Sequence, residues 1–329
     1  MKVGSNWLRS AGLAFALVAV SVAMQSPAAA QQYPSQDIRV ICAFPAGSGA
    51  DVLVRYFAEK LRPIVGGRSV IVENKVGAGG NIATEYVARA KPDGYTIFVH
   101  AATAVAASMY LVKNPPIDVG KSFQIAATIN RQPFMVVVDA KSPYKTLAEL
   151  TEAMKKKGDK ASYAYAAPTG AIMGEIYKNA TGVRAIDVQY KTAPDSLNEI
   201  LSGKLDYAMH DPVFALAQAR EGRLRILAVS TGKRLAASPD LPTMTELGVP
   251  MDLTGWWAAM VPTGTPKPVI DQIHKWFFQI VSADDTKKCL NSFGGDPNIQ
   301  TPEEAQKVFL QDIKNWGDYV KMAKLQPQG

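Results

Sequence analysis

The chain has 329 residues, of which 47% are hydrophobic and 20% charged, and its formal net charge is +7 at pH 7. This length is comfortable for two lobes of about 150 residues with a large core. The charge is a mild positive bias that fits anionic solutes. The one short basic run, residues 155–157, has no interleaved aromatic residues, which argues against nucleic acid as a partner.

The N-terminus has the pattern of a secretory signal peptide. Lys2 and Arg9 flank the start of an uncharged apolar run, residues 11–24, and small residues follow it. A run of about 14 residues is short for a membrane span, and no later stretch is long enough to serve as one. We therefore expect residues 1–30 to be cleaved near Ala30 and the product to be exported, to the periplasm in a Gram-negative cell.

The first part of the remaining chain alternates between strands and helices. Leu53, Phe57 and Leu61 recur at i, i+4 and i+8, which places them on one helical face. Short connections of this kind predict a parallel sheet with right-handed crossovers. The predicted elements are strand 38–44, the helix with these three residues, strand 69–73, helix 81–90 and strand 95–99.

The same alternation begins again near residue 134 and predicts a second α/β lobe. Its expected elements are strand 134–138, a helix from 147, strand 162–166, helix 172–180, strand 185–188, helix 193–201, strand 205–209, helix 213–220 and strand 224–229. Two connections, near 126–134 and 256–261, would form a hinge. The predicted units are residues 31–130 for lobe 1, 131–256 for lobe 2, and 257–329 for the return to lobe 1, which ends in helices 266–281 and 303–324.

The loop between the first strand and the first helix is the most informative segment. It has almost no side-chain bulk and lies at a helix N-terminus, where unpaired N–H groups and the helix dipole attract anions. The alternative is a tight connection with Asp51 as a helix cap. The candidate binding residues of this loop are Phe44, Pro45, Ala46, Gly47, Ser48, Gly49 and Ala50.

The second lobe has a similar loop between a strand and a helix. In open parallel sheets, ligands bind at the carboxyl ends of strands, where both loops fall. Two helix N-termini that face each other would hold a small carboxylate through main-chain N–H groups. The candidate residues of the second loop are Ala167, Pro168, Thr169, Gly170 and Ala171.

The cysteines and histidines indicate no metal or cofactor. Cys42 and Cys289 are exported together, and whether they form a disulfide stays open. His100, His210 and His274 are scattered without the spacing of metal ligands. We expect structural roles for all three, although His100 and His210 fall at strand ends that line a cleft between lobes.

An ordered set of segments runs through the whole chain after residue 43. The segments are 44–51 with Arg55, 72–75, 77–81, 91–96, 190–191, 201–206, 239–243 with 246–248, 256–266, and Trp316. In order and spacing, this set resembles the substrate-binding proteins of tripartite tricarboxylate transporters, the Bug receptors. Each segment alone is common, and the ordered set is specific.

The resemblance implies an α/β fold of the type II periplasmic binding proteins, in which two Rossmann-like lobes joined by a two-segment hinge close on one solute. In such receptors a carboxylate is held by the two strand-to-helix loops, largely through main-chain groups and ordered water. The resemblance adds Asn81, Ala102, Thr103, Asp211 and Pro212 to the expected ligand-binding residues. It implies a monomer without enzymatic activity or cofactor.

The expected function is delivery of a small organic carboxylate to the membrane components of a tripartite transporter. A ligand sensor for a signalling receptor is an alternative with the same fold. An exported hydrolase is a weaker alternative, because no Gly-x-Ser-x-Gly elbow surrounds Ser48. Residues 77–80 resemble a phosphate-binding loop but lack the Lys-Ser/Thr pair that should follow. The sequence leaves the acid open among dicarboxylates, tricarboxylates, acidic amino acids and aromatic acids.

Overall fold

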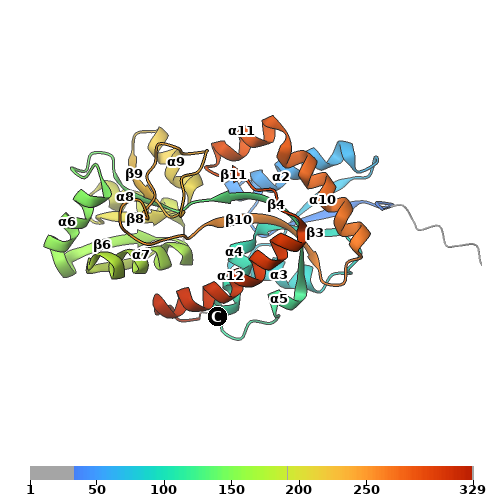
Figure 1. The fold of residues 1–329 in the computed structure, drawn as a ribbon, viewed down its shortest axis with the longest axis horizontal. Helices are drawn as coiled ribbons and strands as arrows, with labels where there is room; N and C mark the ends of the chain where they lie inside the picture. Colours follow the sequence, from blue (N-terminus) through green and yellow to red (C-terminus); the bar gives the residue numbers. More distant parts are fainter. Residues whose placement is uncertain (1–32, 191, 328–329) are drawn as a thin grey trace, which may run out of the picture.

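The chain forms two sheets that lie side by side along the long axis of the molecule, each flanked by helices (Figure 1). The computed structural model describes residues 33–190 and 192–327. The predicted signal peptide, residues 1–30, lies outside this part of the chain. The arrangement confirms the expected α/β fold class with two lobes.

The first sheet has six strands in the order β11–β4–β10–β3–β1–β2. Its strands are β1 Ile38–Cys42, β2 Val70–Asn74, β3 Thr96–Ala101, β4 Phe123–Gln132, β10 Gly255–Pro262 and β11 Asp296–Pro297. The α-helices next to them in the chain are α2 Gly49–Leu61, α3 Asn81–Ala88, α4 Ala102–Leu111, α5 Val119–Ser122, α10 Lys267–Ser282, α11 Asp284–Ser292 and α12 Pro302–Met322. Short 3-10 turns cover Arg62–Ile64 and Ala78–Gly80.

The second sheet has five strands in the order β7–β6–β8–β5–β9. Its strands are β5 Met135–Asp139, β6 Ala161–Tyr165, β7 Ala185–Gln189, β8 Tyr207–His210 and β9 Leu224–Val229. The helices are α6 Leu147–Lys157, α7 Pro168–Thr181, α8 Ala193–Leu201 and α9 Pro212–Arg220, with a 3-10 turn at Gly158–Lys160. Every strand and helix that the sequence predicts in this region is present.

The expected parallel pairing is confirmed for part of each sheet. β1 pairs in parallel with β2 and β3, and β6 pairs in parallel with β7 and β8. In contrast, β10 is antiparallel to β3 and β4, and β5 is antiparallel to β8 and β9. The chain leaves the first sheet through β4 and returns through β10, so these two strands run in opposite directions. The strands that link the two sheets, for which the sequence predicts no direction, are therefore antiparallel to their neighbours.

The linking strands also carry core residues on both faces. Trp256 and Trp257 are neighbours in β10, and both are buried at 4% and 6% exposure. Because side chains alternate along a strand, Trp256 packs in the cluster with α4 and α12, while Trp257 packs in the cluster with α2 and α10. The two neighbouring tryptophans therefore pack on opposite faces of the sheet.

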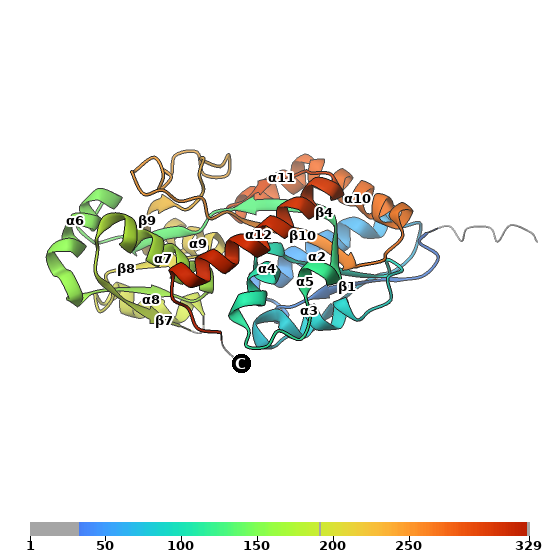
Figure 2. The same cartoon turned by 60° about the horizontal axis from the view of Figure 1, so that its bottom comes forward.

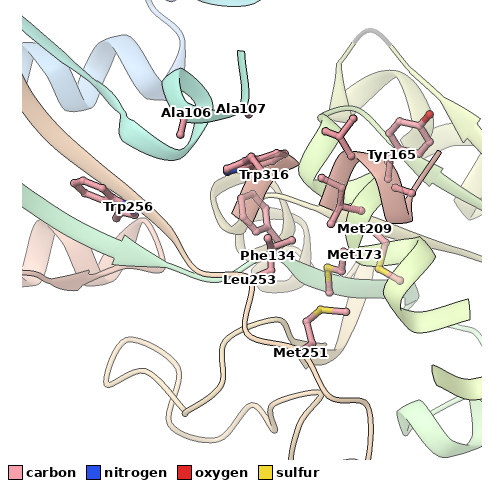
Figure 3. Close-up of a cluster of buried hydrophobic side chains, with 14 of the residues drawn as sticks. Ala106, Ala107, Phe134, Tyr165, Met173, Met209, Met251, Leu253, Trp256 and Trp316 are labelled. Atoms are coloured by element: carbon pink, nitrogen blue, oxygen red, sulfur yellow. The ribbon is translucent and has the colours of Figure 1, made fainter. Parts of the chain in front are cut away.

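Helix α12 joins the two halves of the molecule (Figure 2). It begins with a capping box, in which Thr301 accepts a hydrogen bond from the Glu304 backbone N–H and the Glu304 carboxylate accepts one from the Thr301 N–H. Its later turns contact α4 and α7. Figure 3 shows Trp316 of α12 beside Phe134 and Leu253 within one apolar cluster. This buried cluster includes residues of both sheets.

The contact between Gly174 and Tyr163 gives a test of the core of the second sheet. A Cβ at Gly174 of α7 would lie 2.3 Å from Cζ of Tyr163, which is fully buried. We expect Gly174→Ala to lower the free energy of unfolding by about 1 to 2 kcal/mol, because overpacking outweighs the helix-propensity gain of about 1 kcal/mol. Urea denaturation measures this change. Asn179→Ala, at an exposed position of α7, is the control, and equal stability of both variants would contradict the packing argument.

Candidate functional site

The loop that follows β1 is organised around a buried carboxylate. Asp51 is 1% exposed. Its Oδ2 accepts hydrogen bonds from the Gly47 backbone N–H and from Arg55 Nε, each at 2.8 Å, and its Oδ1 accepts one from Asn74 Nδ2 at 2.7 Å. Ser48 caps α2, since its hydroxyl accepts from the Asp51 backbone N–H at 3.2 Å. Asp51 therefore fixes the loop from inside, and the helix cap is Ser48.

Burial of Asp51 alone would raise its pKa, but the hydrogen bonds from Arg55, Asn74 and Gly47 outweigh burial and lower the pKa to about 2. Asp51 is thus ionised at neutral pH. Arg55 pairs with it across one helical turn, so the buried charge is compensated. The positive φ of Gly47, +81°, allows the turn that brings the Gly47 N–H to Asp51.

The first turn of α2 leaves two main-chain donors available. The N–H groups of Ser48, Asp51 and Val52 have acceptors within the loop. Among the described residues, the N–H groups of Gly49 and Ala50 donate no hydrogen bond. Unpaired N–H groups at the positive end of a 13-residue helix are donors of the kind that suit an anion. The N–H of Gly47, which the sequence places in the anion site, is instead taken by Asp51.

The second sheet approaches this position through α9. A Cβ built on Gly49 would lie 3.3 Å from Cγ1 of Val213, in the first turn of α9. Asp211 caps α9 by accepting a hydrogen bond from the Phe214 backbone N–H at 3.0 Å, and burial raises the pKa of its carboxyl group. The first turns of α2 and α9 therefore meet at Gly49 and Val213, and Asp211 and Pro212 immediately precede Val213 in the chain.

The second loop, 167–171, lies at the same edge of the second sheet as Asp211. β6 and β8 are parallel neighbours, so the segments that follow them leave the sheet together. Ala167 is the residue before α7, and the hydroxyl of Thr169 in the first turn is buried without a hydrogen-bond partner among the described residues. An unpaired buried hydroxyl is available to a ligand that reaches this turn.

Gly170 has a packing role that its sequence context does not reveal. A Cβ at Gly170 would lie 2.7 Å from the Met209 carbonyl oxygen and 2.7 Å from the Tyr165 Cβ. Helix α7 can approach β6 and β8 this closely only when the residue is glycine. Substitution of Gly170 would disturb the second sheet itself, whereas a Cβ at Gly47 would meet nothing within 4 Å.

The ligand-binding residues expected after β2 and β3 differ in how exposed their side chains are. Asn81 is partly exposed, and its side-chain amide donates to the Ala78 carbonyl at 2.7 Å. Ala102 and Thr103, predicted as a turn, are the first residues of α4. Ala102 is completely buried, and Thr103 lines a separate cavity beside α12. The sequence missed α4 because its residues are small and apolar on all sides, without helical periodicity.

The two histidines at strand ends are both buried. His100 lies among the rings of Phe44, Phe98 and Trp257, and burial lowers its pKa to about 4. His210 Nε2 lies 3.0 Å from the Ser196 hydroxyl, and burial likewise lowers its pKa to about 4. Both are neutral at neutral pH. Their contacts are those of packed side chains, as expected.

Two residues of the site were missed by the sequence reasoning. The side-chain amide of Asn74 donates hydrogen bonds to the Asp51 carboxylate and to the Phe44 carbonyl. In the sequence, Asn74 appears only within 72–75, one of the segments that carry the family resemblance. Val213 opposes Gly49, and no sequence signal identifies it. Cys42 and Cys289 are both free.

Within residues 33–190 and 192–327, no group of three or more histidine, cysteine or acidic side chains is placed to hold a metal ion. No helix in the same ranges has the length and apolar character needed to cross a membrane.

The two-sheet architecture is that of the periplasmic binding proteins. The solved structure of the periplasmic binding protein BugD has a TM-score of 0.75 at 32% identity, over 90% of this chain and 100% of that one. A solved structure of an R. palustris protein with adipate has a TM-score of 0.79 at 27% identity, with the same coverage of 90% and 100%. The class of the protein is therefore a periplasmic solute-binding receptor.

Residues 53–325 match the family described as the tripartite tricarboxylate transporter family receptor. BugT of Bordetella pertussis is 27% identical over 300 residues, which are 90% of this chain and 92% of that protein. A UPF0065 protein of Bordetella bronchiseptica is 29% identical over 314 residues, 94% of this chain and 93% of that protein. The chain belongs to the tripartite tricarboxylate transporter receptor family. This is a family of substrate-binding receptors and not of enzymes, and it implies a periplasmic location.

The Asp51 cluster predicts a specific pH dependence of stability. Because the pKa of Asp51 is lowered to about 2, its stabilising contribution is complete above pH 4 and is lost as the pH falls toward 2. We expect Asp51→Asn to lower the free energy of unfolding by about 2 kcal/mol at pH 7 and to flatten its decline between pH 4 and 2.

Urea denaturation of both proteins across this range measures the difference. Asp240→Asn is the matched control, since Asp240 is exposed and makes no hydrogen bond within the described chain. Parallel pH profiles for wild type and Asp51→Asn would show that the buried carboxylate does not stabilise the loop.

Proposed function

We propose that this receptor binds a small organic carboxylate between the helix N-termini of its two sheets and delivers it to the membrane components of a tripartite transporter. One observation carries the proposal: within the described chain the N–H groups of Gly49 and Ala50 donate no hydrogen bond, and Val213 of α9 lies opposite Gly49. A carboxylate at this point receives two charge-assisted hydrogen bonds and the field of the helix dipole.

The proposed contacts use main-chain groups in place of charged side chains. They comprise the first loop around Gly49 and Ala50, the second loop around Thr169, and Asn81 and Asp211 at the adjoining helix starts. Charge-assisted hydrogen bonds contribute roughly 1.5 to 3 kcal/mol each, so three or four support micromolar binding after association costs. Ala102 is left out of this set because it is completely buried.

The relatives support a carboxylate as the ligand class. The R. palustris structure with adipate contains a dicarboxylate and shares 27% identity with this chain over nearly its whole length. The carboxylate is the group that different organic acids share, and the turn contacts only this group. The distal part of the ligand pocket contacts the rest of the acid and therefore varies more between receptors. We therefore extend the carboxylate, and not adipate itself, to this receptor.

Closure of the two lobes would accompany binding. A ligand that touches both α2 and α9 favours the closed arrangement by its differential contacts there. Other contacts between the two halves would add to this state. The Asp296 carboxylate accepts hydrogen bonds from the backbone N–H groups of Ala236 and Ala237 at 2.8 and 2.7 Å, and Arg220 donates to the Ser292 carbonyl at 3.1 Å.

The ligand class is tested directly on protein purified from the periplasm. Mass spectrometry of the small molecules released on denaturation is expected to find an organic acid. Calorimetry with dicarboxylates, tricarboxylates, acidic amino acids and aromatic acids then ranks the candidates. Absence of saturable binding for all four classes, in folded and ligand-free protein, would refute the proposal.

A substitution at Gly49 tests whether the first turn of α2 belongs to the carboxylate site. We expect Gly49→Leu to weaken carboxylate binding at least tenfold, about 1.4 kcal/mol, because the new side chain fills the space between α2 and Val213. Thermal stability should change little, since the position is exposed at a helix start.

The control is Val52→Leu, which adds bulk to the same turn at a position that is 48% exposed. Calorimetry measures affinity, and small-angle scattering with and without the acid measures closure. Full affinity and normal compaction in Gly49→Leu would exclude the turn of α2 from the site.

A further inference from the structure

A cavity of about 300 Å³ lies between the linking strands and α12, and the proposed ligand contacts do not use it. Its walls come from the start of α4, from β4 and β10, from the segment before β10, from the segment after β11 and from α12. The lining residues that matter chemically are Arg131, Asp252, Trp256, Gln300, Asp312 and Tyr319.

Three side-chain oxygen acceptors of the cavity lining have no hydrogen-bond partner within the described chain. One oxygen of Asp312 accepts from Trp256 Nε1 at 2.6 Å, and the other has no partner in the described chain. Gln300 Oε1 is buried and has none either. Asp252 uses one oxygen for the Gly232 N–H and the Thr254 hydroxyl, which leaves its second oxygen available. A donor-rich occupant would satisfy all three groups.

Three aromatic side chains also line the cavity. Trp256 and Trp316 are 4% and 3% exposed, and Tyr319 lies edge-on to Trp316 with ring centroids 6.2 Å apart. Indole and phenol faces attract cations, most strongly when water is excluded. Aromatic faces next to free carboxylate oxygens are the combination that recognises ammonium groups.

We propose that this cavity is a second binding site, which takes a small organic cation carrying a primary ammonium or guanidinium group. The ammonium would donate to Asp312, Asp252 and Gln300, and its hydrocarbon part would lie against Trp256 and Trp316. A free anion fits poorly, because it would face two carboxylates. Arg131 and Asp252 are both exposed and therefore belong to the rim of the cavity, whereas Asp312 is partly buried deeper in it.

The cavity lies beside the strands that form the expected hinge between the lobes. β4 and β10 are the strands that link the two sheets, and α12 contacts helices of both halves. A molecule between them touches elements that must shift when the lobes close. This second site stands independently of the proposed carboxylate site, since it rests on a separate cavity.

Binding of the cation is expected to compete with protonation of Asp312. Burial raises the pKa of this carboxyl group to about 6, with the Trp256 hydrogen bond opposing the shift. The other ionisable groups that line the cavity are Arg131, Asp252 and Tyr319. Affinity for the cation should therefore fall about tenfold between pH 7.5 and pH 5, as Asp312 becomes neutral.

The experiment uses the full mature receptor with 1,4-diaminobutane and agmatine as probes, and acetate as the anionic comparison. Calorimetry measures affinity, and tryptophan fluorescence reports contact with Trp256 and Trp316. Asp312→Asn keeps an acceptor for Trp256 Nε1 but removes the charge, and is expected to weaken amine binding at least about tenfold. Asp318→Asn is the matched control, because Asp318 is an exposed acid on the same helix.

Support requires saturable amine binding, its loss in Asp312→Asn, its retention in Asp318→Asn, and weaker binding at pH 5. Carboxylate binding in Asp312→Asn is measured on the same sample, so loss of folding is distinguished from loss of the second site. No binding of either amine to wild type at concentrations up to about 10 mM overturns the proposal. Equal amine affinity in wild type and Asp312→Asn, or preference for acetate in this cavity, overturns it as well.

Discussion

The candidate binding turn depends on the buried carboxylate of Asp51. An acidic side chain in the first turn of a helix weakens the attraction of that turn for an anionic ligand. Here Arg55 neutralises the charge, and Asn74 and the Gly47 N–H occupy the remaining acceptor positions. The carboxylate therefore shapes the loop without competing for the N–H groups of Gly49 and Ala50. The ion pair between Asp51 and Arg55 thus lets the carboxylate stabilise the loop without repelling an anionic ligand at the same turn.

The continuous apolar cluster around α12 limits how the lobes can move. Trp316 of α12 packs in the same cluster as side chains from both sheets, so the two halves do not have fully separate cores. Closure that opened this cluster would expose apolar surface to water, at a free-energy cost of roughly 25 cal/mol per Å². Rotation about the antiparallel pair of β4 and β10 avoids this cost, because it keeps α12 in contact with both sides. The register shifts in that pair, at Trp257/Ala258 and Ala259/Met260, are irregularities at which such strands bend.

The sequence predicted the parts of the fold that have a local signal. Strands and helices with clear periodicity were found, such as the helix that holds Leu53 and Phe57. Helix α4 has no amphipathic pattern and was missed. The antiparallel direction of β10 depends on the path of the chain between sheets, which no local pattern encodes. The site was predicted as a pair of loops, whereas the contact between Gly49 and Val213 depends on the placement of residues 164 positions apart.

Three glycines that look equivalent in the sequence are required for different physical reasons. Gly47 adopts a left-handed turn with open space around it, so a side chain there would strain the backbone. Gly49 has an ordinary φ but faces the opposite lobe, so a side chain would act on closure. Gly170 touches the carbonyl of Met209, so a side chain would act on the second sheet. Substitution at Gly49 therefore acts on the contact between the two lobes, whereas substitution at Gly47 or Gly170 acts on backbone strain or packing within one lobe.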